Sequence, residues 1–346
     1  MVEWKKLGEV CRTVSPPKKL EKEQYGEVGL YPIIDQGQKE IVGYTDDITT
    51  LLPENEYVLF GDHTRYVKFH NGKFAQGADG LKILRSDDSL IPKYFYYVFS
   101  NAEIPSRGYS RHWSIAKEIQ IPVPSLSEQT RIVGILDTFT SAIDNLKAQI
   151  AQRRKQYEYY RDQLLDLEGK DGVEMKKLGE ICDLITGGEV PDNTNKGQLH
   201  PTKDYPYAVY TNGKEVYGFS NTYQVDADAV CISSIGANTG AIFYKTGKFT
   251  PAIRLKVLLP QNGIIPKYLY YACSKIDFKG RNTGSVPNIN AEYVKGRKLS
   301  VPSLIEQQRI VSILDTFEAS IQNLEAQLKQ REKQYEYYRN QLLTFE

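Results

Sequence analysis

The chain has 346 residues, enough for two or three ordinary domains, and its 40% hydrophobic and 25% charged residues are a globular composition. Its 44 Lys and Arg residues balance 43 Asp and Glu residues, so net charge alone indicates neither a nucleic-acid binder nor a membrane-surface protein. No run approaches the roughly 18 unbroken apolar residues of a membrane helix, and the first residues lack the apolar core of a secretory signal. We therefore expect a soluble, cytoplasmic protein with no membrane partner.

Residues 1–122 are expected to form a mixed α/β domain. Strands are predicted at 56–60 and 66–69, and a helix near Ile91-Pro92. Two polar loop segments lie beside these elements, and Arg and Asn side chains in such loops can bind guanine and adenine edges. The candidate DNA-binding residues here are Asp62, His63, Arg65, Arg107, Tyr109, Arg111 and His112. An ordinary surface loop is the alternative interpretation, since loops are generally polar.

Residues 123–168 are predicted to form a long helix, because apolar residues recur at steps of four and three from Ile132 to Leu167. A Ser-x-x-Glu capping box, Ser125 to Glu128, fixes its start. Glycines in the linker 169–173 mark its end. The pattern is typical of a coiled-coil seam.

Residues 174–300 are expected to form a second α/β domain, with a strand at 229–232 and a helix near Ile265-Pro266. It has 16 Lys and Arg against 11 Asp and Glu, whereas the first domain has 16 against 17. Its loops supply the candidate DNA-binding residues Ser233, Asn238, Lys279, Arg281, Asn282, Ser285 and Asn288. A second long helix follows at 301–346.

The chain is a tandem duplication. Residues 123–168 align without gaps on 301–346 with 32 identities in 46 positions. Between the shared segments only short patches agree, such as Ile91-Pro-Lys-Tyr-Phe-Tyr-Tyr97 with Ile265-Pro-Lys-Tyr-Leu-Tyr-Tyr271. The helix-pairing residues are predicted to be Leu136, Phe139, Ile143, Leu146, Ile150, Leu314, Phe317, Ile321, Leu324 and Leu328.

Charges beside the seam favour antiparallel pairing of the two helices of one chain. Lys147 and Arg154 flank the first seam, and Glu325 and Glu332 hold the same positions in the second. An antiparallel pair brings these opposite charges together. Each exposed pair contributes only a few tenths of a kcal/mol, so solvated charges without a selective role remain an alternative.

No catalytic constellation is recognised in the sequence. The single Pro-Pro lacks the aromatic residue of an amino-methyltransferase motif, and no P-loop occurs. Asp62 with Lys68, or Asp192 with Lys203, could serve a nuclease only with carboxylate partners that the sequence does not indicate. The cysteines Cys11, Cys182, Cys231 and Cys273 form no metal-binding spacing, so we expect core positions for them and no metal site.

The sequence resembles the specificity (S) subunits of type I restriction-modification systems. The resemblance rests on the duplicated motif Pro-Ser-Leu-x-Glu-Gln-x-x-Ile-Val-x-Ile-Leu-Asp at 124–137 and 302–315, on the helix after each copy, on the Lys-Leu-Gly-Glu domain openings, and on Gly-Ser-Val-Pro-Asn-Ile at 284–289. The first domain departs from the last pattern, with Ser-Arg-His-Trp-Ser-Ile at 110–115.

This resemblance implies two tandem target recognition domains, 1–122 and 174–300, each reading half of a bipartite double-stranded DNA target. The conserved helices 123–168 and 301–346 would form a central and a distal coiled coil, pair antiparallel, set the spacing and dock two methyltransferase (M) subunits. Restriction/translocase (R) subunits would complete the complex. It implies no active site in this chain, with S-adenosylmethionine, ATP and Mg²⁺ on the partner subunits. A coiled-coil scaffold with two protein-binding domains and no DNA recognition is the alternative, and a fused nuclease is a third.

Overall fold

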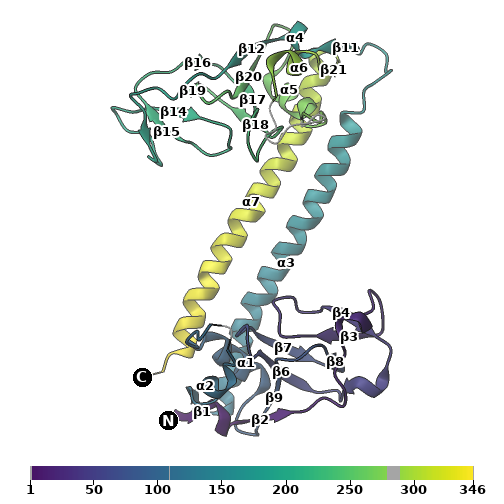
Figure 1. The fold of residues 1–346 in the computed structure, drawn as a ribbon, viewed down its shortest axis with the longest axis vertical. Helices are drawn as coiled ribbons and strands as arrows, with labels where there is room; N and C mark the ends of the chain where they lie inside the picture. Colours follow the sequence, from purple (N-terminus) through teal and green to yellow (C-terminus); the bar gives the residue numbers. More distant parts are fainter. Residues whose placement is uncertain (1, 109, 279–288, 346) are drawn as a thin grey trace. The chain divides into compact units, whose positions relative to one another are not determined.

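The computed structural model describes residues 2–108, 110–278 and 289–345, which form two compact units. Unit 1 comprises Met1–Ala148 together with Ala326–Glu346, and unit 2 comprises Gln149–Glu325. Each unit therefore contains one α/β domain and parts of both long helices, α3 (Leu126–Leu164) and α7 (Leu304–Leu343) (Figure 1). Within the described residues, no helix is both long and apolar enough to cross a membrane.

Unit 1 contains two four-stranded sheets and a short two-stranded ribbon. The first sheet is antiparallel, in the order β2 (Cys11–Val14), β9 (Leu81–Ser86), β6 (Glu56–Gly61), β7 (Val67–Asn71). The second has the order β4 (Gly43–Thr45), β3 (Tyr31–Ile34), β8 (Phe74–Gln76), β5 (Leu51–Leu52), with β3 and β8 parallel. The ribbon pairs β1 (Glu3–Lys6) with β10 (Gln120–Val123).

Unit 2 repeats this arrangement with one more strand in its second sheet. Its first sheet has the order β12 (Cys182–Thr186), β20 (Lys256–Pro260), β17 (Ala229–Ile232), β18 (Ile242–Lys245). Its second has the order β13 (Asn195–Lys196), β15 (Gly218–Ser220), β14 (Tyr207–Tyr210), β19 (Lys248–Pro251), β16 (Val225–Asp226), with β14 and β19 parallel. Its ribbon pairs β11 (Glu174–Lys177) with β21 (Lys298–Val301).

Short helices complete both domains. In unit 1 they are α1 (Pro92–Asn101) and α2 (Trp113–Ala116), and in unit 2 they are α4 (Leu178–Ile181), α5 (Pro266–Cys273) and α6 (Ala291–Lys295). Helix α1 packs on β6, β7 and β9, and α5 packs on β17, β18 and β20. Both begin with proline at the first turn, where a missing N–H costs nothing, as the sequence predicted. The expected mixed α/β class is confirmed.

A buried glutamine joins each long helix to its own domain. The side chain of Gln129 accepts the Ile91 N–H at 2.8 Å and donates to the carbonyl oxygens of Ser89, at 2.8 Å, and Pro124, at 2.9 Å. Gln129 is fully buried, so its own amide has no water to bond instead. The amide therefore holds the start of α3 against the start of α1.

Unit 2 contains the same joint. Gln307, also fully buried, accepts the Ile265 N–H at 2.9 Å and donates to the carbonyl oxygens of Gly263 and Pro302, both at 3.0 Å. The two α/β domains, whose sequences agree only in short patches, thus keep equivalent bonding at this point.

A tyrosine and a lysine strengthen each joint. Tyr97 on α1 donates its hydroxyl to the carboxylate of Asp137 on α3, and the Lys93 ammonium lies 3.6 Å from the same carboxylate. In unit 2 the corresponding bond joins Tyr271 to Asp315 at 2.5 Å, with Lys267 at 3.5 Å. The repeated Ile-Pro-Lys-Tyr-x-Tyr-Tyr patch is therefore the surface that holds the helix.

The two long helices run antiparallel, as the charge pattern predicted. In unit 1, Phe139 of α3 stacks on Tyr338 of α7 with ring centroids 5.3 Å apart, and the Lys147 ammonium lies 3.8 Å from the Glu332 carboxylate. Leu343, near the end of α7, is 5% exposed in the core that also contains Ile132 and Leu136.

Unit 2 shows the other half of the pairing. Tyr160 of α3 stacks on Phe317 of α7 at 5.3 Å, and Arg154 bonds Glu325 at 2.5 Å. The remaining members of the predicted pairing set are all buried or half-buried: Leu136, Ile143, Leu146, Ile150, Leu314, Ile321, Leu324 and Leu328. All four flanking charges thus meet partners of opposite sign.

The helix ends differ from the expectation in two details. Ser125 and Ser303 accept the N–H groups of Glu128 and Glu306, but those carboxylates turn to Arg131 and Arg309, so only half of each capping box forms. Helix α3 ends at Leu164, before the expected residue 168. Leu165 and Leu167, beyond its end, are buried in the core of unit 2.

Removing one joint should weaken only its own unit. Gln129→Ala removes three hydrogen bonds, one buried and two partly buried, so we expect a loss of about 2 to 4 kcal/mol in the free energy of unfolding of unit 1. Both tryptophans, Trp4 and Trp113, belong to unit 1. Urea titration should therefore shift the tryptophan fluorescence transition in Gln129→Ala but not in Gln307→Ala, which should shift only the circular dichroism signal. Gln152→Ala on the exposed face of α3 is the control. Equal fluorescence shifts in both joint variants would contradict the assignment.

The buried thiols predict loss of stability in alkali. Burial raises the pKa of Cys182 and of Cys231 to about 12, and it also raises the pKa of Cys273. The unfolded chain ionises these thiols from about pH 8.5, so above that pH it gains about 1.4 kcal/mol per pH unit for each thiol. The urea midpoint should fall between pH 8.5 and pH 10. The variant Cys182→Ala, Cys231→Ala, Cys273→Ala should show a flatter profile, and an unchanged slope would contradict this origin.

Candidate functional site

In unit 1 the candidate residues lie where the β6–β7 connection meets the segment after α1. The Asp62 carboxylate is 2% exposed and accepts the Trp113 N–H at 2.7 Å. The Asp62 carbonyl oxygen accepts the His112 N–H at 2.8 Å. The connection and the segment are thus tied together by main-chain and side-chain bonds.

His112 closes the same network from inside the domain. It is fully buried; its Nε2 accepts the Arg107 N–H at 3.1 Å, and its Nδ1 lies 2.9 Å from the Asp62 carbonyl oxygen. Nε2 accepts a main-chain N–H, so Nδ1 carries the ring proton. The buried Asp62 and His112 therefore hold the segment after α1 in position, while Arg107 and Arg111 are exposed on that segment.

Arg65 and His63 are also used within the domain. Arg65 has a left-handed backbone, φ 64°, and its guanidinium donates to the Ile104 carbonyl oxygen at 2.9 Å. His63 is half-buried, and its N–H donates to the Gln36 side chain at 3.2 Å. Among the described candidates of this unit, Arg107 and Arg111 are exposed cations whose side chains form no hydrogen bond or ion pair with other described residues.

In unit 2 an asparagine that was not among the predicted site residues organises the corresponding loops. The Asn212 carbonyl oxygen accepts the Ser233 hydroxyl at 3.1 Å and the Asn238 amide at 3.2 Å, and its side chain accepts the Ser234 N–H at 2.8 Å. Ser233 is fully buried, whereas Asn238 is exposed. The sequence indicated Asn212-Gly213 only as a turn.

Both units close the site with the same main-chain bond. The Ser234 carbonyl oxygen accepts the Ile289 N–H at 2.8 Å, just as the Asp62 carbonyl oxygen accepts the His112 N–H. Six further candidates lie outside the described residues, so their assignment stays a prediction: Tyr109, Lys279, Arg281, Asn282, Ser285 and Asn288.

The grouping of Asp62 with Lys68 that was considered for a nuclease is not assembled. Lys68 donates its ammonium protons to the carbonyl oxygens of Asp35, at 2.9 Å, and Lys39, at 2.5 Å, whereas the Asp62 carboxylate lies 3.8 Å from Lys82. Across the described residues, no cluster of three or more His, Cys, Asp or Glu side chains could hold a metal ion.

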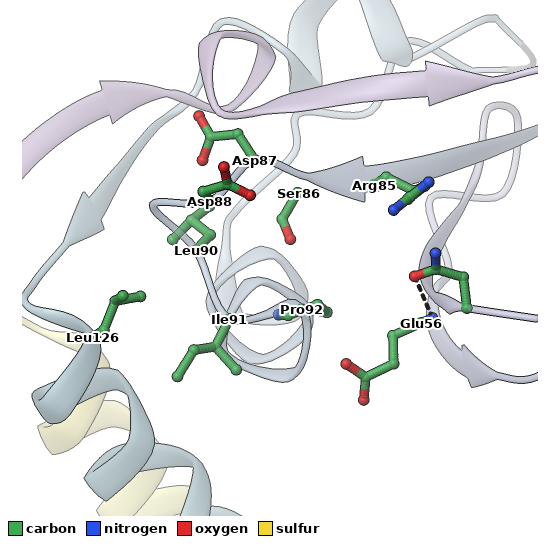
Figure 2. Close-up of a pocket in the computed structure, with 10 residues that line it drawn as sticks. Glu56, Arg85, Ser86, Asp87, Asp88, Leu90, Ile91, Pro92 and Leu126 are labelled. Atoms are coloured by element: carbon green, nitrogen blue, oxygen red, sulfur yellow. Dashed lines mark hydrogen bonds between the residues drawn. The ribbon is translucent and has the colours of Figure 1, made fainter.

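A hollow of about 320 Å³ lies between the end of β9 and the start of α1 (Figure 2). Its carboxylates do not converge: Asp87 and Asp88 lie on one side and Glu56 on the other. Asp87 is already bonded to Ser89, accepting its N–H at 2.9 Å and its hydroxyl at 2.6 Å. The hollow therefore presents no ready set of ligands.

Comparison with known proteins is consistent with this architecture. A family described as "Type I restriction modification DNA specificity domain" matches residues 1–153 and 170–332. The type I restriction enzyme EcoR124I/EcoR124II specificity subunit of Escherichia coli is 33% identical over 99% of this chain and 94% of that protein. A putative type I restriction enzyme specificity subunit of Haemophilus influenzae is 28% identical over 99% of this chain and 96% of that protein.

A solved structure shares the fold. The type I restriction-modification S subunit from M. genitalium superposes with a TM-score of 0.73 at 19% identity, covering 100% of this chain and 97% of that one.

Proposed function

Because the chain belongs to the type I restriction-modification DNA specificity family, we propose that each of its two units reads one half of a bipartite double-stranded DNA target. As a specificity subunit the chain selects the DNA sequence and does not itself catalyse a reaction. The observation that carries the division into half-sites is the contrast between the two copies. Their joints and closing main-chain bonds are equivalent, while their exposed loop residues differ, as reading two different sequences requires.

The helix pair is proposed to set the half-site spacing and to dock two methyltransferase subunits. Support for docking comes from Tyr159 and Tyr337, which occupy equivalent positions on α3 and α7 and are 59% and 58% exposed. Their neighbours Tyr160 and Tyr338 are engaged in the helix pair. Exposed tyrosines on a rigid helix are typical of protein interfaces.

The remaining components are proposed on other subunits. Restriction/translocase subunits complete the complex, and S-adenosylmethionine, ATP and Mg²⁺ bind to the partners. One of the similar solved chains comes from a structure described as showing the complex assembly and conformational transition of the type I R-M system.

The exposed loop residues should act on separate half-sites. Arg107→Ala with Arg111→Ala should relax the bases read at one half-site, and Asn238→Ala those at the other, since a bidentate base contact contributes about 1 to 3 kcal/mol. Methylome sequencing of cells that carry each variant with the methyltransferase subunit measures this directly.

Lys5→Ala is the control, because its ammonium pairs with Glu3 on the β1–β10 ribbon. Methylation that is unchanged at both half-sites in all variants would remove these loops from the interface. A coiled-coil scaffold without DNA recognition predicts that deleting this chain leaves the methylome unchanged.

Lengthening both helices should lengthen the spacer between the half-sites. One heptad inserted after Ile150 and another after Leu328 keeps the seam in phase and adds about 10 Å at 1.5 Å per residue. We expect roughly three more base pairs of unread spacer, with one or two pairs of adjustment because DNA also rotates by about 100° over that length. The methylome would show unchanged half-sites with a longer spacer. An active complex that keeps its original spacer would contradict this role for the helices.

A further inference from the structure

The two units hold equivalent lysines in different electrostatic surroundings. Lys82 lies opposite Phe60 in the β6–β9 pair, and Lys256 lies opposite Ile232 in the β17–β20 pair. Asp62 lies two positions after Phe60, and Ser234 lies two positions after Ile232. The carbonyl oxygens of Asp62 and Ser234 accept the equivalent main-chain N–H bonds described above. The strand register and the closing bond agree, so these positions are structurally equivalent.

Unit 1 supplies a counter-ion for its lysine. The buried Asp62 carboxylate lies 3.8 Å from the Lys82 ammonium. Unit 2 has a hydroxyl at that position instead, and Ser234 donates it to the Arg254 carbonyl oxygen at 2.6 Å. The second copy has therefore lost the internal anion but kept the cation.

Lys256 is consequently a buried cation without an ion pair among the described residues. It is 6% exposed, and its ammonium has one hydrogen-bond partner, the Thr186 hydroxyl at 3.1 Å. Burial lowers the pKa of Lys256, and the nearby charge of Arg254 lowers it further. A buried charge that has lost solvent and has no anionic partner is unfavourable, so an external anion would stabilise it.

A second cation is held beside it by a strained backbone. Ile253 and Arg254 both adopt left-handed conformations, with φ 50° and 60°, whereas Gly80 precedes the corresponding strand of unit 1 with φ 96°. Left-handed backbone is unfavourable for a residue other than glycine, and more so when the side chain is β-branched. Backbone strain of this kind is concentrated at functional sites.

Main-chain bonds hold this conformation in place. The Ile253 N–H donates to the Gly188 carbonyl oxygen at 2.7 Å, and the Arg254 N–H donates to that of Gly187 at 2.9 Å. The Asn212 amide donates to the Ile253 carbonyl oxygen. A Cβ at Gly187 would lie 2.7 Å from the Ala252 nitrogen, so only glycine permits this close approach.

The strained pair leaves the Arg254 side chain exposed at the edge of a hollow of about 470 Å³. Its lining is mostly glycine and apolar, from Gly187, Gly188, Val190, Ile235 and Ile253, with one carboxylate, Glu189. Within the described residues, the guanidinium of Arg254 has neither a hydrogen bond nor an ion pair, so its five N–H donors are open to a ligand.

We infer that Arg254 and Lys256 bind one phosphate group of the DNA backbone next to the half-site read by unit 2. Arg254 makes the direct contact, because its planar donors match two phosphate oxygens, and Lys256 supplies a second positive charge behind it. The inference rests on the proposed function. It also explains why the domain with a surplus of basic residues lacks the carboxylate that its sister copy uses. Unit 1, whose lysine is already neutralised, has no such contact at the equivalent position.

Three variants in the full chain, assembled with its methyltransferase subunit on a duplex carrying the mapped target, test this site. Lys256→Met and Arg254→Gly should each weaken binding about tenfold and reduce the slope of log K against log salt by about 1. Ser234→Asp, which copies the counter-ion of unit 1, should have the same effect on the slope. Because Arg254→Gly also relieves the backbone strain, its thermal midpoint should stay equal or rise, an outcome that loss of a purely structural arginine would not give.

Lys176→Met is the matched control, since it removes a lysine of the same unit whose ammonium pairs with Glu174 at 2.7 Å. Neutral methylphosphonate groups placed singly along the unit 2 half-site should weaken the unmodified protein at one position and have no further effect on Arg254→Gly.

Three results would overturn the site: unchanged affinity and slope in Arg254→Gly, equal losses in Lys176→Met, or stabilisation by inorganic phosphate that needs Lys256 while DNA binding does not. Failure of the unmodified complex to bind its target specifically would instead contradict the proposed function.

Discussion

The amide of Gln129, which water cannot reach, accepts one main-chain N–H and donates to two main-chain carbonyl oxygens. Breaking any one of these bonds leaves a buried polar group unsatisfied, so the angle between the domain and its helix is held by a large penalty rather than by weak surface contacts. Gln307 imposes the same constraint in the second copy. The helix pair can organise two domains only because each domain is fixed in this way to its own helix.

The joint also gives a physical reason for the distribution of similarity between the two copies. The residues that hold the helix agree between the two domains: Tyr97 and Tyr271 bond Asp137 and Asp315, and Lys93 and Lys267 lie beside the same carboxylates. The loops that follow β6 and β17 face no such constraint beyond the one main-chain bond to the carbonyl oxygen of Asp62 or Ser234. They can therefore change chemistry completely, from Asp62 with Lys82 to Ser234 with Lys256, while the strand register stays the same.

Much of the architecture could be predicted from sequence because it depends on local periodicity and on charge. The steps of four and three residues gave the helices, and the signs of Lys147, Arg154, Glu325 and Glu332 gave their antiparallel pairing. The site was less predictable, because its bonds join residues far apart in the chain. Nothing near Asp62 in sequence indicates that it meets His112 and Trp113 inside the domain. The prediction of complete capping boxes was wrong for a related reason, because Arg131 and Arg309 bind the carboxylates of the two capping glutamates instead.

Arg254 and Lys256 belong to no sequence motif that would have marked them as site residues. The signal that could have identified them was a comparison of the copies, in which Leu81-Lys-Ile-Leu84 matches Leu255-Lys-Val-Leu258 while Asp62 has no acidic counterpart. Left-handed backbone at Ile253 could not be read from residue types, because β-branched residues rarely adopt it.

The order in which this chain is synthesised has a consequence for the core of unit 1. That core includes Leu343, with Leu342 and Phe345 packed against it, yet these residues emerge from the ribosome only after the whole of unit 2. Unit 2 is one uninterrupted segment, so it can complete its fold as it emerges. At about 5 to 20 residues per second, the apolar face of α3 in unit 1 waits roughly 10 to 35 s for its partner. During that interval the apolar face of α3 in unit 1 lacks its α7 partner, and apolar surface exposed in this way favours wrong association between nascent chains.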